Sequence, residues 1–168
     1  MSDLIVDLYR HSEWANLRLL EECRALTDEQ LDTCAVGTHG SIRETFVHLV
    51  AGEQRYIRRL GGQPVAPNVR ETEPFPGFDV IGAAVRDNAR CLIERVPATQ
   101  GTIITSVFQG ATYSIDAEIV LVQAIGHAGE HREQICAILT SLGIAPPDIS
   151  GWEWGEAEGR SLRSEPLA

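Results

Sequence analysis

The segment from residue 116 to 142, DAEIVLVQAIGHAGEHREQICAILTSL, decides the fold of this chain. Its apolar residues recur at helical spacing and predict one long helix, with Gly143 at its C-terminal cap and prolines beyond it. The inward side of this helix is predicted to carry Val120, Ala124, His127, His131, Ile135 and Ile138. Because His127 and His131 are four residues apart, both imidazoles lie on one face, one turn apart. Two ring nitrogens in this position can bind the same metal ion.

Apolar periodicity predicts two more helices, at residues 4–25 and 79–96. The inward stripe of the first consists of Leu4, Leu8, His11, Ala15 and Leu19. In the second, Asp79 is the predicted N-cap. Pro97 is placed beyond its end, because a proline inside a helix removes a backbone hydrogen bond.

The remaining long helix begins with a capping box, Ser41-Ile-Arg-Glu44. In this motif the serine hydroxyl accepts from the backbone N–H of the glutamate, whose carboxylate reaches back to the backbone N–H of the serine. The helix is predicted to end at Leu60, before two glycines. Its inward stripe consists of Thr45, His48, Leu49, Gly52 and Tyr56. His48 therefore occupies a position where a core residue is expected.

Two segments outside the helices complete the predicted architecture. Residues 63–78 contain four prolines and no periodicity, which indicates a crossover loop long enough to reach the far end of a bundle. Residues 102–108 and 111–115 have strand-like composition around a Gln-Gly turn and predict a β-hairpin. We therefore predict an all-α fold: an up-and-down four-helix bundle with a long crossover loop and a small β-hairpin before the last helix.

The whole chain, residues 1–168, is predicted to form one domain. Its length and its hydrophobic content of 43% are sufficient for a substantial core. The tail, residues 144–168, is expected to pack on the bundle through Trp152 and Trp154.

The composition excludes several classes of function. The 14 basic and 24 acidic residues give a net charge of −10 and the basic residues form no run, so neither nucleic acid nor an acidic membrane surface is an expected partner. No apolar stretch is long enough to span a bilayer. The four cysteines lack a Cys-x-x-Cys spacing and follow no secretory signal, which predicts reduced thiols in a cytoplasmic protein.

Three histidines, His48, His127 and His131, fall on predicted core faces. Each neutral imidazole has a donor and an acceptor, so burial without partners would be costly. A shared metal ion would bind one nitrogen of each ring, and three protein ligands leave the open coordination position of a catalytic site. The alternative is that these histidines form hydrogen bonds or a surface pair and bind no metal.

The segment His127-Ala-Gly-Glu-His131 also matches the inverted zincin motif, in which Glu130 would be the general base. We expect no peptidase, because the chain after His131 is too short for the rest of such a domain. His11 is expected to be a hydrogen-bonded core residue rather than a further ligand, and His39 to lie in an exposed loop. Glu53 and Glu130 are expected to be solvated or to support the histidines.

Matching segments of a known pattern are spread over most of the chain. They are Trp14–Leu20, Thr45–Glu53, Gly126–Ile135, Leu139–Gly143 and Gly151–Gly155. From about residue 5 to residue 160, this pattern resembles the DinB/YfiT-like family of metalloenzymes. The specific element is the combination of the histidine in the second long helix with the His-x-x-x-His-Arg-x-Gln run in the last.

The resemblance implies a four-helix bundle, often dimeric, in which three histidines hold a divalent ion such as zinc or nickel. His48, His127 and His131 occupy those three places. The better-understood relatives use the metal to activate a low-molecular-weight thiol in transferase or isomerase reactions.

We therefore expect a homodimeric, metal-dependent enzyme that transfers a small thiol, or water, to a small electrophilic substrate, in the manner of a thiol S-transferase. A metal-dependent hydrolase and a non-catalytic protein that binds a metal or small ligand are the alternatives.

Overall fold

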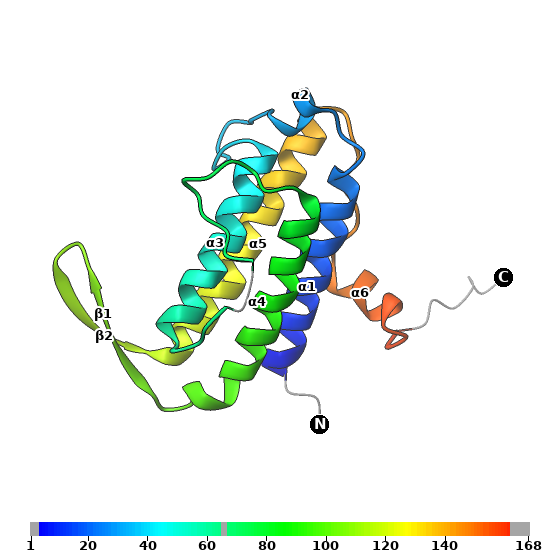
Figure 1. Ribbon diagram of the computed structural model, residues 1–168. Coiled ribbons are helices and arrows are strands. Elements are labelled where there is room, and N and C mark those ends of the chain that lie inside the picture. Colours follow the sequence, from blue (N-terminus) through cyan, green and yellow to red (C-terminus); the bar gives the residue numbers. More distant parts are fainter. Residues whose placement is uncertain (1–3, 65–66, 162–168) are drawn as a thin grey trace.

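The computed structural model describes residues 4–64 and 67–161 of the chain, without the side chains of Ser106 and Phe108. Within this part the elements follow one another in the order α1 (Leu4–Cys23), α2 (Asp28–Leu31), α3 (Ile42–Arg59), α4 (Phe78–Thr99), β1 (Ile103–Phe108), β2 (Ala111–Asp116), α5 (Ala117–Ser141) and α6 (Gly151–Ala157). The long helices α1, α3, α4 and α5 form a bundle (Figure 1), as the sequence predicts.

The direction of the helices explains the crossover loop. Helices α1 and α5 run one way and α3 and α4 run the other, so the loop between α3 and α4 returns the chain to the end where α3 began (Figure 1). Helix α3 packs against α4 and α5, and α1 packs against the same two helices from the other side. The apolar core between the four helices includes Leu19, Phe46, Leu49, Ile81, Ile135 and Leu139.

Helix α3 begins as predicted. The Ser41 hydroxyl accepts from the backbone N–H of Glu44 (3.3 Å), and the Glu44 carboxylate accepts from the backbone N–H of Ser41 (2.8 Å). This cap fixes where the helix starts and therefore which side faces the core. Leu49 and Gly52 on that side are buried, and the side chain of His48 remains 18% exposed.

The inward face of α1 differs from the prediction. Leu4 and Leu8 are 72% and 41% exposed, although the later members of the predicted stripe, Ala15 and Leu19, are buried. The buried face instead includes two polar residues that accept hydrogen bonds from a buried arginine of α5. A buried guanidinium needs such acceptors. Ser12 and Asn16 of α1 therefore face the core, although an apolar pattern assigns them to the surface.

Both ends of α4 also differ from the prediction. The N-cap is Gly77, whose φ of +97° favours glycine, and Asp79 lies in the first turn, where it pairs with Arg24 (2.7 Å). Pro97 does not end the helix, which continues to Thr99. The Thr99 hydroxyl donates to a carbonyl of the preceding residues (2.8 Å), so a side-chain hydrogen bond supports the final turn.

The predicted β-hairpin connects α4 to α5. Strands β1 and β2 pair antiparallel over their whole length. Gln109 and Gly110 join them with φ angles of +49° and +78°, the left-handed conformations that a two-residue type I′ turn requires. The hairpin projects away from the bundle (Figure 1), which leaves Ile103 and Val107 exposed.

The tail packs on α1 through α6, and one of the two expected tryptophans takes part. The Trp154 ring lies edge-on to the His11 ring, with centroids 5.7 Å apart, and His11 Nε2 donates to the carbonyl of Ile149 (2.9 Å). Trp152 is 83% exposed, so the prediction that it docks is wrong. Residues 162–168 lie outside the described part of the chain. Every helix that the structure describes is too short or too polar to cross a bilayer.

Candidate metal centre

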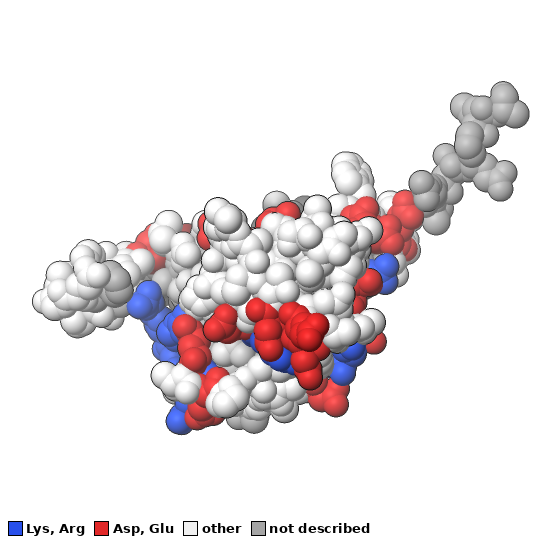
Figure 2. All heavy atoms as spheres, turned by 90° about the horizontal axis from the view of Figure 1, so that it is seen from above, with Lys and Arg blue, Asp and Glu red and all other residues white. Residues whose placement is uncertain are grey.

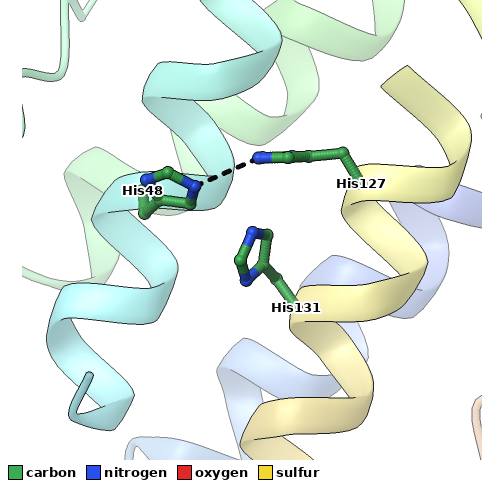
Figure 3. A group of neighbouring side chains, drawn as sticks. All are labelled: His48, His127 and His131. Atoms are coloured by element: carbon green, nitrogen blue, oxygen red, sulfur yellow. Dashed lines mark hydrogen bonds between the residues drawn. The ribbon is translucent and has the colours of Figure 1, made fainter. Parts of the chain in front are cut away.

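Two neighbouring helices bring the three predicted ligands together. His48 comes from α3, His127 and His131 come from α5, and the three rings meet in the space between the two helices (Figure 3). Each ring offers a nitrogen that lies within 4.8 Å of a nitrogen of the other two. The Nε2 atoms of His48 and His127 are 3.2 Å apart. Nitrogens this close need a shared proton or cation between them, because two lone pairs would repel.

A glycine allows His127 to reach this position. A Cβ atom at Gly52 of α3 would lie 2.5 Å from Cε1 and 3.1 Å from Nε2 of His127. Any larger residue at this position would push the imidazole away from α3. The ring from α5 thus occupies the space that a side chain on α3 would take.

A hydrogen bond determines which nitrogen of His131 faces the cluster. Nδ1 lies 2.9 Å from Oε1 of Gln134, and an amide oxygen only accepts, so Nδ1 carries the hydrogen. Nε2 therefore keeps its lone pair for a ligand. The same Gln134 oxygen accepts from the backbone N–H of His39 (3.0 Å), which ties the loop before α3 to α5.

A carboxylate from the crossover loop approaches the outer nitrogen of His48. Oε2 of Glu71 lies 3.1 Å from His48 Nδ1, and the guanidinium of Arg55 contacts the other oxygen of the same carboxylate. Burial raises the pKa of Glu71, but its contacts with Arg55 and His48 outweigh this effect and leave the pKa below its usual value. A carboxylate at Nδ1 favours the tautomer in which Nε2 is free to bind a metal.

Two of the three rings have a buried Nδ1 atom without a hydrogen-bond partner among the residues that the structure describes, those of His127 and His48. Within the described part of the chain, Nδ1 of His48 has only the ion-pair contact with Glu71, and Nδ1 of His127 has no such contact. Burial, with smaller effects from His131 and His48, lowers the pKa of His127 to about 4. Burial also lowers the pKa of His131. Both rings are therefore neutral at pH 7, which is the form that binds a metal.

The donor set fits a divalent ion. Neutral imidazoles are good ligands for zinc, nickel, copper and iron. Three of them leave a coordination position open, unlike the closed set of four that is typical of structural zinc sites. The arrangement can therefore hold an ion and present it to a further small molecule.

Two residues near the cluster were not assigned to it from the sequence. His39 is exposed as predicted, but its ring stacks on His48 with centroids 3.7 Å apart, and His39, His48 and Glu71 form a second group of potential ligands. A histidine in the loop directly before the cap of α3 was the available signal for His39. Glu71 lies in a proline-rich loop without periodicity, so no sequence pattern indicated its position.

The sequence led us to expect Glu53 to be solvated or to support the histidines, but its side chain is buried within the bundle at 5% exposure. Its carboxylate accepts from the side chain of Asn88 (3.0 Å), and burial raises its pKa to about 7. Asn16 hydrogen-bonds to Glu53 and also accepts from Arg132 (2.9 Å). With Ser12, which also accepts from Arg132 (2.9 Å), these residues connect all four long helices. We call them the interior network.

The other two candidates lie outside the cluster. Glu130 is exposed, on a different side of α5 from the buried His127 and His131. His11 is half-buried at the contact between α1 and the tail, where its hydrogen bond to the Ile149 carbonyl satisfies it, as predicted for a structural residue.

A bundle with a potential ligand set on facing helices defines the class: four-helix-bundle proteins with a candidate metal centre between the helices. The chain belongs to the DinB family, whose model matches residues 1–160. Among solved structures it is similar to a DinB-like protein from Bacillus cereus ATCC 10987, with a TM-score of 0.68 and 17% identity over 87% of this chain and 95% of that one. At this identity the likeness shows the fold alone. A comparison with curated proteins finds no match.

Proposed function

We propose that His48, His127 and His131 bind one divalent metal ion, zinc or nickel, and that the protein is an enzyme that transfers a small thiol, or water, to an electrophilic substrate. The observation that supports the proposal is the convergence of three imidazoles with ligand atoms within 4.8 Å of one another. A bound divalent ion would supply the charge that keeps a thiol or water deprotonated near neutral pH.

The residues around the cluster have separate roles in this proposal. Gln134 and Glu71 orient the rings of His131 and His48, so that an Nε2 lone pair of each faces the site. Gly52 makes room for His127. The choice of a thiol rests on analogy with the better-understood members of the family, and water at the same position would make the protein a hydrolase.

The metal content of purified protein tests the proposal. The wild-type chain should contain close to one equivalent of metal, and the His127→Ala and His131→Ala variants should contain none. His11→Ala is the matched control, because His11 lies at the tail contact and should leave the metal content unchanged. Full occupancy in both cluster variants would show that the ligands lie elsewhere.

An activity assay distinguishes the proposed transferase from a hydrolase, a non-catalytic binding protein and a purely structural role of the histidines. The metal-loaded chain should consume a small thiol in the presence of an electrophile such as an epoxide or a maleate ester, and a chelator should abolish this reaction. Ester hydrolysis without a thiol would indicate a hydrolase. A metal-loaded protein inactive toward thiols, electrophiles and esters would indicate a binding protein. An unchanged melting temperature after chelation, with no metal in the native protein, would indicate a structural role for the histidines.

We further propose that the protein is a homodimer. Apolar side chains are exposed on the projecting hairpin, at Ile103 and Val107, and on the neighbouring part of α5, at Ile119 and Val122. A two-stranded hairpin is marginal in water without further packing, which a second subunit would provide. Sedimentation equilibrium of the wild-type chain should give twice the monomer mass, and a Val107→Glu/Val122→Glu variant should give the monomer mass. A cytosolic location suits the four free cysteines and a thiol substrate.

A further inference from the structure

We infer that a groove beside α3, lined by Arg55, Arg58 and Arg70, binds an anionic group of the substrate, such as a carboxylate or phosphate, while the reactive atom of that substrate lies at the three histidines. The inference rests on the proposed function. Beyond that function, the inference specifies that the substrate is anionic and that it extends from the histidines toward the groove.

The groove carries a surplus of positive charge in an acidic protein. It has a volume of about 530 Å³, and its lining includes the three arginines and one carboxylate, that of Glu71. Arg55 contacts Glu71, Arg70 approaches Glu73 (3.4 Å), and Arg58 donates to the neutral amide of Asn68. The lining residues thus sum to a positive charge, whereas the whole chain has a net charge of −10.

The arginines remain available to a ligand. The Arg55 and Arg70 side chains are 52% and 62% exposed, and Arg58 is exposed as well. Each guanidinium has five N–H donors, and the contacts within the protein use only some of them. The planar arrangement of these donors matches the two oxygens of a carboxylate or phosphate.

The groove adjoins the histidines through a single side chain. One Glu71 oxygen lies 3.1 Å from His48 Nδ1, and the other contacts Arg55. Glu71 therefore separates the histidine cluster from the arginines. The inferred substrate therefore has its anionic group in the groove and its reactive atom beside the histidine cluster.

A second cleft on the other side of Glu71 has the opposite charge. It has a volume of about 510 Å³, and its carboxylates are Asp32, Glu44, Glu71 and Glu73. Its one arginine, Arg43, is bound by Asp28 and Asp32. Figure 2, which views the molecule from the end of the bundle that carries α2, shows acidic side chains gathered on that end. An anionic group is repelled from this cleft and attracted to the groove, so charge determines the direction in which the substrate lies.

Succinate is a suitable first probe, because its binding can be measured by calorimetry on the metal-free chain. The test variant is Arg58→Gln/Arg70→Gln. The control is Arg18→Gln/Arg86→Gln, which removes the same charge from exposed positions on α1 and α4. The test variant should bind succinate about five-fold more weakly than the wild-type chain, and the control should bind it like the wild-type chain. Equal affinity for the wild type and the test variant would overturn the inference.

Thiol binding by the cobalt-loaded chain tests the link to the histidines, because sulfur coordination is visible as a charge-transfer band. The wild-type chain should bind 3-mercaptopropionate more tightly than 2-mercaptoethanol. The Arg58→Gln/Arg70→Gln variant should lose about five-fold in affinity for 3-mercaptopropionate and nothing for 2-mercaptoethanol. Equal losses for both thiols would overturn the inference. If the wild-type chain binds no cobalt, the proposed function fails, and the succinate titration still decides whether the groove binds anions.

Discussion

The bundle contains two buried polar clusters that differ in how their polar side chains are hydrogen-bonded. In the interior network, Arg132 donates to Ser12 and Asn16, and Asn88 donates to Glu53, while Oδ1 of Asn88 has no partner among the described residues. In the histidine cluster, two Nε2 atoms face each other at 3.2 Å and Nδ1 of His127 has no partner among the described residues. Hydrogen bonds between polar side chains stabilise a fold, whereas neutral imidazoles whose nitrogens converge form a set of ligands suited to a metal ion. This difference supports a structural role for the first cluster and our proposal of a functional role for the second.

The largest expected effect is on the interior network. Arg132→Met should lower the free energy of unfolding at pH 8 by about 3 kcal/mol, because it leaves Glu53 buried without a nearby cation. Urea denaturation measures this loss, and Arg10→Met, at an exposed arginine, is the control. The folded fraction of the Arg132→Met variant should still bind one metal ion. A loss of metal binding with little loss of stability would reverse our assignment of the two clusters.

The second prediction concerns pH. The pKa of Glu53 is raised from 4.5 to about 7, chiefly by burial, so the folded chain keeps a proton that the unfolded chain releases between these values. The contribution of this proton to stability is complete below pH 4.5 and is lost as the pH rises to about 7. The free energy of unfolding of the wild-type chain minus that of Glu53→Gln should therefore fall by a few kcal/mol over this range.

Metal-free protein is the right sample for this comparison, because the proposed metal binding by the histidines would also depend on pH. Titration of His127 and His131 is common to both chains and cancels in the difference. Urea denaturation at several pH values gives the curve. A difference that does not change with pH would mean that Glu53 is ionised in the folded chain throughout the range.

The third prediction tests the close approach of α3 and α5 at Gly52 and His127. Gly52→Ala should weaken metal binding by about ten-fold to a hundred-fold, because the added Cβ displaces the ring of His127. Gly126→Ala is the matched control, since a Cβ at that position of α5 meets nothing within 4 Å. The control should keep its metal affinity and gain up to about 1 kcal/mol of stability from the better helix propensity of alanine. Competition with a chromogenic chelator measures the affinities.

The smallest expected effect comes from the orientation of His131. Gln134→Leu removes the acceptor that holds the hydrogen on Nδ1, and metal affinity should fall by about ten-fold. The Gln134→Glu variant retains an acceptor at this position and should restore most of the affinity. If leucine and glutamate have the same effect, Gln134 does not act through the tautomer of His131.

The parts of the structure that follow apolar periodicity were predictable from the sequence. The start of α3 and the inward positions of His127 and His131 are local consequences of a capping box and of helical spacing. Two histidines on one helix face, with a third on the inward side of another helix, were sufficient to indicate the candidate site.

The remaining features depend on contacts between distant segments. Ser12 and Asn16 face inward because of a buried arginine more than a hundred residues away, and apolar spacing cannot reveal such a pairing. The same limit applies to Glu53, which looks like a surface residue until Asn88 and Arg132 are placed beside it. Glu71 reaches His48 from a loop without periodicity, so only the three-dimensional path of that loop shows the contact.

The most direct test of the central claim is the X-ray absorption spectrum of the zinc-loaded protein. We predict zinc bound by three imidazoles at about 2.0–2.1 Å, with one further light ligand. The imidazole signal should disappear in each of the His48→Ala, His127→Ala and His131→Ala variants. A spectrum of zinc bound only by oxygen atoms, or one that these substitutions leave unchanged, would contradict the assignment of the three histidines as a metal centre.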